Sequence, residues 1–94
     1  MKVAVRFFTV LREITGKREE EMEVSNAIKV QDVLSHLSKL YGSKFVDYVY
    51  DEKGDPRGYL QFLVNGRSIT TLQGFETKLK EGDRVAIIPP VGGG

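Results

Sequence analysis

The sequence contains no cysteine and no tryptophan, and its single histidine is His36. Without cysteine there is no disulfide, no thiolate nucleophile and no Cys ligand for zinc or an iron–sulfur cluster. One histidine also leaves a His-based catalytic centre or metal site without its usual partners. We therefore expect no catalytic residue, no metal site and no bound cofactor among these side chains, and we expect His36 to be solvated.

The sequence also lacks long apolar runs and an excess of either charge. Lys and Arg number 14 against 13 Asp and Glu, which gives a net charge of +1. No apolar stretch approaches the roughly 20 residues of a membrane span, and Lys2 and Arg6 interrupt what could be a signal peptide. We expect a cytoplasmic protein of one domain, with neither nucleic acid nor a membrane as partner.

Alternation of apolar and polar residues predicts two strands in the first quarter of the chain. Within residues 2–10, Val3, Val5 and Phe7 share one face, which leaves Phe8 on the other. A turn at residues 15–17 then leads into a second alternating segment, residues 19–24. The two strands are expected to form a hairpin.

The next segment has helical periodicity. Apolar residues recur every three or four positions from Val30 to Tyr41, Gly42 is a typical residue to end a helix, and Ser25 and Asn26 are good N-cap types. Residues 43–58 are less regular and predict a short helical turn followed by an exposed loop. Acidic residues of that loop do not have the spacing of a calcium-binding loop, so solvated charges are expected.

Three further strands complete the predicted fold. Residues 59–64 and 67–70 flank Asn65-Gly66, a dipeptide that favours a two-residue hairpin turn, and residues 84–88 alternate again. The expected fold is α+β, with one main helix on a mixed sheet of about five strands, which is the β-grasp (ubiquitin-like) arrangement. The pattern does not decide which of Phe62, Leu63 and Val64 face outward.

The C-terminal residues carry the functional signal. We divide the chain into a folded domain, residues 1–88, and a tail, residues 89–94, that begins with Pro89 and Pro90 and ends with Gly92, Gly93 and Gly94. The prolines end the strand and stiffen the exit, while glycines without Cβ atoms can enter a channel too narrow for side chains. The alternatives are a frayed terminus or an expression scar.

At this point the sequence resembles a known family. The similar segments are residues 5–16 (VRFFTVLREITG), residues 64–67 (VNGR) and residues 79–91 (LKEGDRVAIIPPV), followed by the glycines. They resemble the small subunits of molybdopterin synthase (MoaD), the thiamine-pathway sulfur carrier (ThiS) and the archaeal ubiquitin-like small modifier proteins. Gly92 stands where the family often has Ser, Thr or Ala, and residues 43–58 follow no family pattern.

The resemblance implies a carrier that is activated by other proteins. An E1-like adenylating enzyme would use ATP to join Gly94 to AMP, and a persulfide would then convert the acyl-adenylate to a thiocarboxylate. The chain would next give its sulfur to a pterin precursor as the small subunit of molybdopterin synthase, for molybdenum cofactor biosynthesis. The alternatives are a modifier that forms isopeptide bonds to lysines of target proteins and an interaction module with a passive tail.

The expected partner surface lies where the tail begins. The alternation turns Phe8 and Ile88 away from the helix, and the family docks by such a patch, so we expect Phe8, Ile88, Pro89 and Pro90 to contact partners. For Arg6 and Arg12, two interpretations remain open: solvated side chains, or contacts at the rim of an acidic partner.

Overall fold

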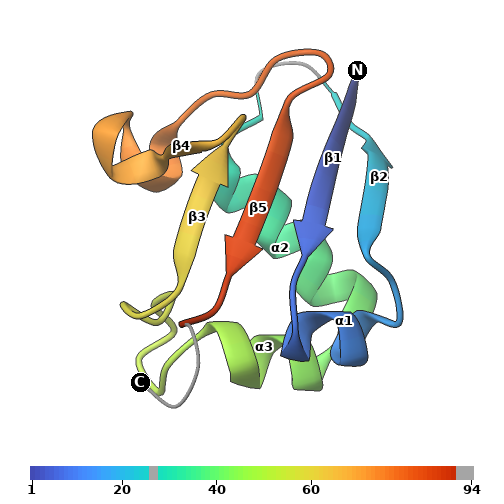
Figure 1. Ribbon diagram of the computed structural model, residues 1–94, viewed down its shortest axis with the longest axis vertical. Helices are drawn as coiled ribbons and strands as arrows, with labels where there is room; N and C mark the ends of the chain where they lie inside the picture. Colours follow the sequence, from blue (N-terminus) through green and yellow to red (C-terminus); the bar gives the residue numbers. More distant parts are fainter. Residues whose placement is uncertain (26–27, 91–94) are drawn as a thin grey trace.

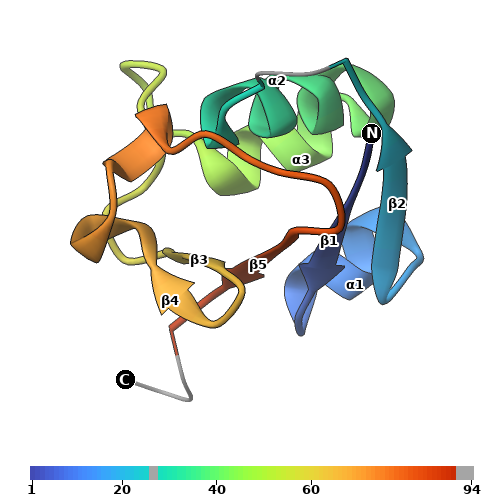
Figure 2. The same ribbon diagram turned by 90° about the horizontal axis from the view of Figure 1, so that it is seen from above.

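The computed structural model describes residues 1–25 and 28–90. It contains a mixed five-stranded sheet with its two longer helices packed on one face (Figures 1 and 2). The strands are β1 (Lys2–Phe7), β2 (Glu19–Glu23), β3 (Gln61–Val64), β4 (Arg67–Ser68) and β5 (Arg84–Ile88). The helices are α1 (Val10–Thr15), α2 (Val30–Tyr41) and α3 (Ser43–Val49), with short 3-10 turns η1 (Ile69–Thr71) and η2 (Gly74–Glu76). This is the expected α+β architecture.

The strand order is β2-β1-β5-β3-β4, and only the central pair, β1 and β5, is parallel. In that pair Val5 lies beside Val85 and Phe7 beside Ile87. The two strands therefore end at the same edge of the sheet, as their arrowheads show in Figure 1. The chain after β1 and the chain after β5 consequently emerge close together.

The core lies between α2, α3 and one face of the sheet. Alternation along each strand supplies the inward residues, and α2 supplies an apolar stripe at helical spacing. Each such side chain stabilises the fold by about 1.5–3 kcal/mol when it leaves water. The largest fully buried side chains are Phe7, Phe45, Leu11, Leu34, Leu37 and Ile87.

The first strand is shorter than the alternation predicts. It ends at Phe7, and Thr9 adopts a φ of 45°, which turns the chain into α1. Val10, expected in the strand, is the first residue of that helix. The periodicity did not reveal α1 because the helix has six residues and buries only Leu11.

The start of α2 also differs from the prediction. Lys29, not Ser25, is the N-cap residue, and its backbone N–H donates to the carboxylate of Asp32 at 2.8 Å. Asn26 lies outside the described residues. The predicted end of α2 is confirmed, since Gly42 follows Tyr41 with a φ of 77°, and α3 occupies the position of the predicted short helical turn.

The second hairpin has the predicted turn but shorter strands. Asn65 and Gly66 have φ values of 51° and 82°, which suit a residue tolerant of positive φ and a glycine. Strand β3 begins at Gln61 rather than at residue 59, and β4 ends at Ser68 because Ile69–Thr71 forms η1. Phe62 and Val64 are buried, so Leu63 is the outward residue.

Candidate functional site: the open sheet face and the tail exit

The tail leaves the body of the protein beside the start of β3. Ile88, the last residue of β5, pairs with Gln61 and is half-buried on the face away from α2. The next residue, Pro89, is buried, whereas Pro90 is exposed. Among the described residues, the chain therefore separates from the body at Pro90. Gly92, Gly93 and Gly94 lie outside the described residues.

The sheet face opposite the helices is open, and its centre has small or half-buried side chains. Ala86 lies between Leu63 of β3 and Arg6 of β1, and Ala4 lies beside Arg84. Ile88 and Leu63 are half-buried on this face. Because these central side chains are small and partly apolar, this face can pack against a flat surface of a partner protein. The sequence predicted Ile88 here, and the structure adds Leu63.

Phe8 lies at the tail-exit edge of this face, beneath two arginines. The guanidinium carbons of Arg6 and Arg12 lie 5.6 Å and 5.5 Å from the centroid of the Phe8 ring. Both distances are in the range of cation–π contacts. The Nε of Arg12 also donates to the backbone oxygen of Phe7 at 3.0 Å. The structure thus brings Phe8 and both arginines together around the end of β1, at the same edge of the sheet at which β5 ends with Ile88.

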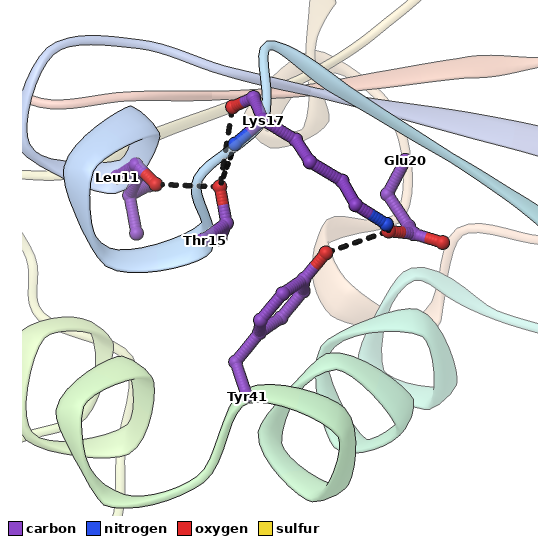
Figure 3. Close-up of polar contacts among 5 residues, drawn as sticks. All are labelled: Leu11, Thr15, Lys17, Glu20 and Tyr41. Carbon is purple, nitrogen blue, oxygen red and sulfur yellow. Dashed lines mark hydrogen bonds and ion pairs between the residues drawn. The ribbon is translucent and has the colours of Figure 1, made fainter.

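A polar network holds α1 against the helical layer (Figure 3). The Thr15 hydroxyl donates to the backbone oxygen of Leu11, and the Lys17 backbone N–H donates to the Thr15 hydroxyl. Lys17 Nζ and the Tyr41 hydroxyl both donate to Glu20 Oε1, at 2.7 Å and 2.6 Å. The network joins the turn after α1 to β2 and to the last residue of α2.

This network shifts the pKa of two of its members. Hydrogen bonds from Lys17 and Tyr41 lower the pKa of Glu20 below its ordinary value of 4.5. Burial, together with the bond to Glu20, raises the pKa of Tyr41. Glu20 is therefore the charged acceptor of the network and Tyr41 its neutral donor near pH 7.

The described residues offer neither a metal site nor a membrane-spanning helix. Within residues 1–25 and 28–90, no three acidic or histidine side chains come together in a way that could hold a metal ion. In the same residues, no helix is long and apolar enough to cross a membrane. His36 is exposed on α2. The clustered groups on the open face are suited to binding: apolar side chains, with two arginines beside them.

Comparison with known proteins identifies the family. Residues 5–94 match the model of the ThiS family, which covers nearly the whole chain and reaches its last glycine. The chain belongs to the ThiS family. The resemblance found in the sequence is thereby confirmed.

Relatives of this ThiS family chain include carriers and modifiers. It is 34% identical to small archaeal modifier protein 3 of Haloferax volcanii over 94 residues, which is the full length of both. It is 28% identical, again over both full lengths, to the molybdopterin synthase sulfur carrier subunit of Chlamydomonas reinhardtii. The solution structure of small archaeal modifier protein 1 from Methanosarcina acetivorans superposes with a TM-score of 0.80 at 39% identity, covering 99% of this chain and 96% of the other. The ubiquitin-like β-grasp fold is confirmed.

Proposed function

We propose that this chain is a sulfur carrier whose working group is the carboxylate of Gly94. The observation that carries the proposal is the end of the ThiS family domain: β5 stops at two prolines, the second is exposed, and the sequence continues with Val91 and three glycines. The body contributes a binding surface, and the reacting group is delivered by the tail. The ATP site and any acid or base belong to the partner enzymes.

Activation begins with an E1-like adenylating enzyme. A carboxylate oxygen of Gly94 attacks the α-phosphorus of ATP and pyrophosphate leaves, which converts a poor acyl donor into an acyl-adenylate. A protein persulfide then attacks the glycine carbonyl, AMP leaves, and a second thiol cleaves the resulting S–S bond. The product is a thiocarboxylate at Gly94. No cofactor is held by the carrier, and ATP is consumed by the activating partner.

The sulfur is then passed on inside a second partner. In the main proposal this chain is the small subunit of molybdopterin synthase, and its tail enters the large subunit. There the thiocarboxylate sulfur forms a bond to a carbon of a pterin precursor, and water then cleaves the resulting thioester, which returns the Gly94 carboxylate. Support comes from the relative of Chlamydomonas reinhardtii, which is named as a molybdopterin synthase sulfur carrier subunit. A tail without bulky side chains after Val91 suits a narrow channel.

The alternative function uses the same carboxylate. If a lysine amine of another protein attacks the activated carbonyl of Gly94, the product is an isopeptide bond. The relative of Haloferax volcanii that is named a modifier matches this chain over its whole length, which favours this second function. One activated tail can serve both functions, because both start from the acyl-adenylate of Gly94, whose carbonyl is attacked by a persulfide in the first case and by a lysine amine in the second.

We propose that both kinds of partner dock on the open face at the tail exit. The proposed contact residues are Phe8, Ile88 and Pro90, with Leu63 as an outward neighbour on the same face. Pro89, which we also expected to contact partners, is buried, so its role in the proposal is to direct the chain toward the exit. From Pro90 an extended tail of four residues reaches about 13 Å. A partner that grips the body at Phe8 and Ile88 therefore holds the reactive carboxylate at a fixed depth.

The test is the intact mass of the chain after incubation with ATP, a sulfur donor and an E1-like enzyme from the same organism. We expect one oxygen to be replaced by sulfur in the full-length chain and no change in a variant that lacks Gly93 and Gly94. An unchanged mass of the folded full-length chain, with an enzyme that is active on another carrier, would contradict the proposal.

The two functions are separated by what the activated chain becomes. With a molybdopterin synthase large subunit and a pterin precursor, sulfur loss from the thiocarboxylate supports the carrier role. With a cell extract from the same organism, conjugation leaves the peptide that follows Arg84 on a target lysine after tryptic digestion. Detection of that branched peptide by mass spectrometry supports the modifier role.

A further inference from the structure

Arg6, Phe8 and Arg12 form a compact cluster, which we call the arginine clamp, at the edge of the sheet where the tail leaves. We propose that the arginine clamp docks against carboxylates that border the tail channel of the adenylating enzyme. The inference rests on the proposed function and goes beyond it, because it assigns a negative charge to the partner surface and names the arginines that contact it.

The two guanidinium groups are held in place but keep donors available. Among residues 1–25 and 28–90, the Arg12 guanidinium is engaged only through its Nε, by the Phe7 oxygen, so within this part of the chain its two terminal nitrogens are available to a planar oxyanion. Arg6 is exposed. Contact with the Phe8 ring restricts both side chains in advance, which lowers the entropy lost on binding a carboxylate.

The orientation of Arg6 says more about partner binding than that of Arg12, because Arg6 has an acidic neighbour within the sheet. Arg6 lies directly opposite Glu19 in the β1–β2 pairing, and opposite charges at such positions commonly pair across strands. Yet within residues 1–25 and 28–90 neither Arg6 nor Arg12 forms an ion pair. Arg6 extends instead toward Phe8, so both positive charges gather at the tail exit and remain without an internal carboxylate.

The position of the clamp excludes a direct part in the chemistry. Four residues in extended conformation span about 13 Å, so an extended tail would carry the Gly94 carboxylate that far beyond Pro90. The clamp lies at the end of β1, where Phe7 pairs with Ile87 of β5. A phosphate of the bound nucleotide is therefore beyond the reach of either arginine. The oxyanions within reach are side-chain carboxylates on the surface that surrounds the channel entrance.

Charge complementarity then defines the partner surface. Two guanidinium groups beside a half-buried aromatic ring fit an apolar pocket that is bordered by at least one Asp or Glu. Paired charges at the edge of an interface mainly speed association and fix orientation. For a carrier that must insert its tail end-on, a fixed orientation at the entrance directs the tail into the channel.

The experiment measures KM and kcat for thiocarboxylate formation with the E1-like enzyme of the same organism, at low and at moderate salt. Variants are Arg6→Glu, Arg12→Glu and Arg12→Lys, and the matched control is Arg84→Glu, which reverses the same charge on the same face at the opposite end. We expect KM to rise about tenfold for each clamp reversal, with kcat unchanged. Arg12→Lys should show a smaller rise, and Arg84→Glu none.

The salt dependence of KM provides a second measurement, which would not change if the two arginines only supported the fold. KM of the unaltered chain should rise with salt, and this dependence should become weaker in both clamp reversals. Equal KM values, within twofold, for the unaltered chain and both folded reversals would overturn the inference and leave the proposed function intact. Failure of the unaltered chain to gain sulfur would instead overturn the proposed function. Folding of each variant is checked by its thermal unfolding midpoint.

Discussion

At the scale of single residues, Glu20 shows how one half-buried acceptor organises its surroundings. Only 15% of its side chain is exposed, and a single oxygen accepts both Lys17 and Tyr41. Tyr41 in turn packs edge-on against Phe7, with ring centroids 6.0 Å apart. The acid therefore links the turn after α1 to the aromatic part of the core.

Tyr41→Phe should remove this link while keeping the aromatic packing. We expect the free energy of unfolding to fall by about 1 kcal/mol at pH 7, since one hydrogen bond to a charged acceptor is lost. Urea unfolding measures the change. Tyr50→Phe is the control, because among the described residues the Tyr50 hydroxyl makes no hydrogen bond. An equal loss in both variants would contradict the assignment.

The same bond predicts a pH dependence. Because the pKa of Glu20 is lowered in the folded protein, its contribution is present above the ordinary value of 4.5 and disappears as the pH falls through the folded pKa. The difference between the unaltered chain and Tyr41→Phe should therefore shrink in acid. Urea unfolding at pH 7 and at pH 3 tests the sign, and a difference that grows toward pH 3 would contradict it.

At the scale of elements, the β3–β4 turn is tied to the strand that carries the tail. The Asn65 side chain donates to Asp83 Oδ1 at 2.9 Å and accepts the Arg84 N–H at 2.9 Å. The other oxygen of Asp83 accepts the Lys80 N–H. One amide thus fixes the start of β5 against the hairpin, at the end of the sheet opposite the tail exit.

Asn65→Ala should lower the free energy of unfolding by about 1–3 kcal/mol, because it removes two side-chain bonds and leaves alanine at a φ of 51°. Asn65→Gly separates the two causes, since glycine accepts that φ without strain. We expect Asn65→Gly to lose less stability than Asn65→Ala in thermal unfolding. If glycine were as harmful as alanine, the side-chain bonds alone would account for the loss.

The elements that the sequence predicted are those with a strong period. Alternation located β1, β2 and β5, the three-and-four spacing located α2, and Asn65-Gly66 located the turn. The facing of β3 was undecided because Phe62, Leu63 and Val64 are all apolar. The burial of Phe62 and Val64, together with the pairing of Leu63 with Ala86, shows that Leu63 is outward. Helix α1 was missed because its six residues bury only Leu11, which leaves no helical period to detect.

The candidate site also has a part that the sequence predicted and a part that only the structure shows. The glycine tail, Phe8 and Ile88 could be inferred from composition and alternation. The arginine clamp could not, because it depends on the turn at Thr9, whose positive φ begins the helix that places Arg12 near the Phe8 ring. Arg12 lies four positions after Phe8, and in an extended strand these two residues would be about 13 Å apart.

At the scale of the whole molecule, the body and the tail should be separable. Pro89 is buried and Pro90 is exposed, so we expect removal of residues 91–94 to leave the core untouched. The thermal unfolding midpoint should stay within about 1 °C of that of the unaltered chain, because loss of an exposed end changes stability little. Sulfur incorporation, measured by intact mass, should be abolished. A markedly lower midpoint would show that the tail also supports the fold.

The parallel pairing of β1 with β5 gives the molecule a polarity that can be used experimentally. The turn before β5 lies at the end of the sheet where β1 begins, since the Gly82 N–H donates to the Lys2 oxygen, and the tail leaves from the other end. The chain has no cysteine, so Lys80→Cys, at an exposed position in that turn, would introduce one unique thiol. Anchored there to a sensor chip or a bead, every copy would be bound by the end of the sheet opposite Pro90, so that the tail exit faces the solution and the immobilised chain becomes an oriented probe for enzymes that accept its tail.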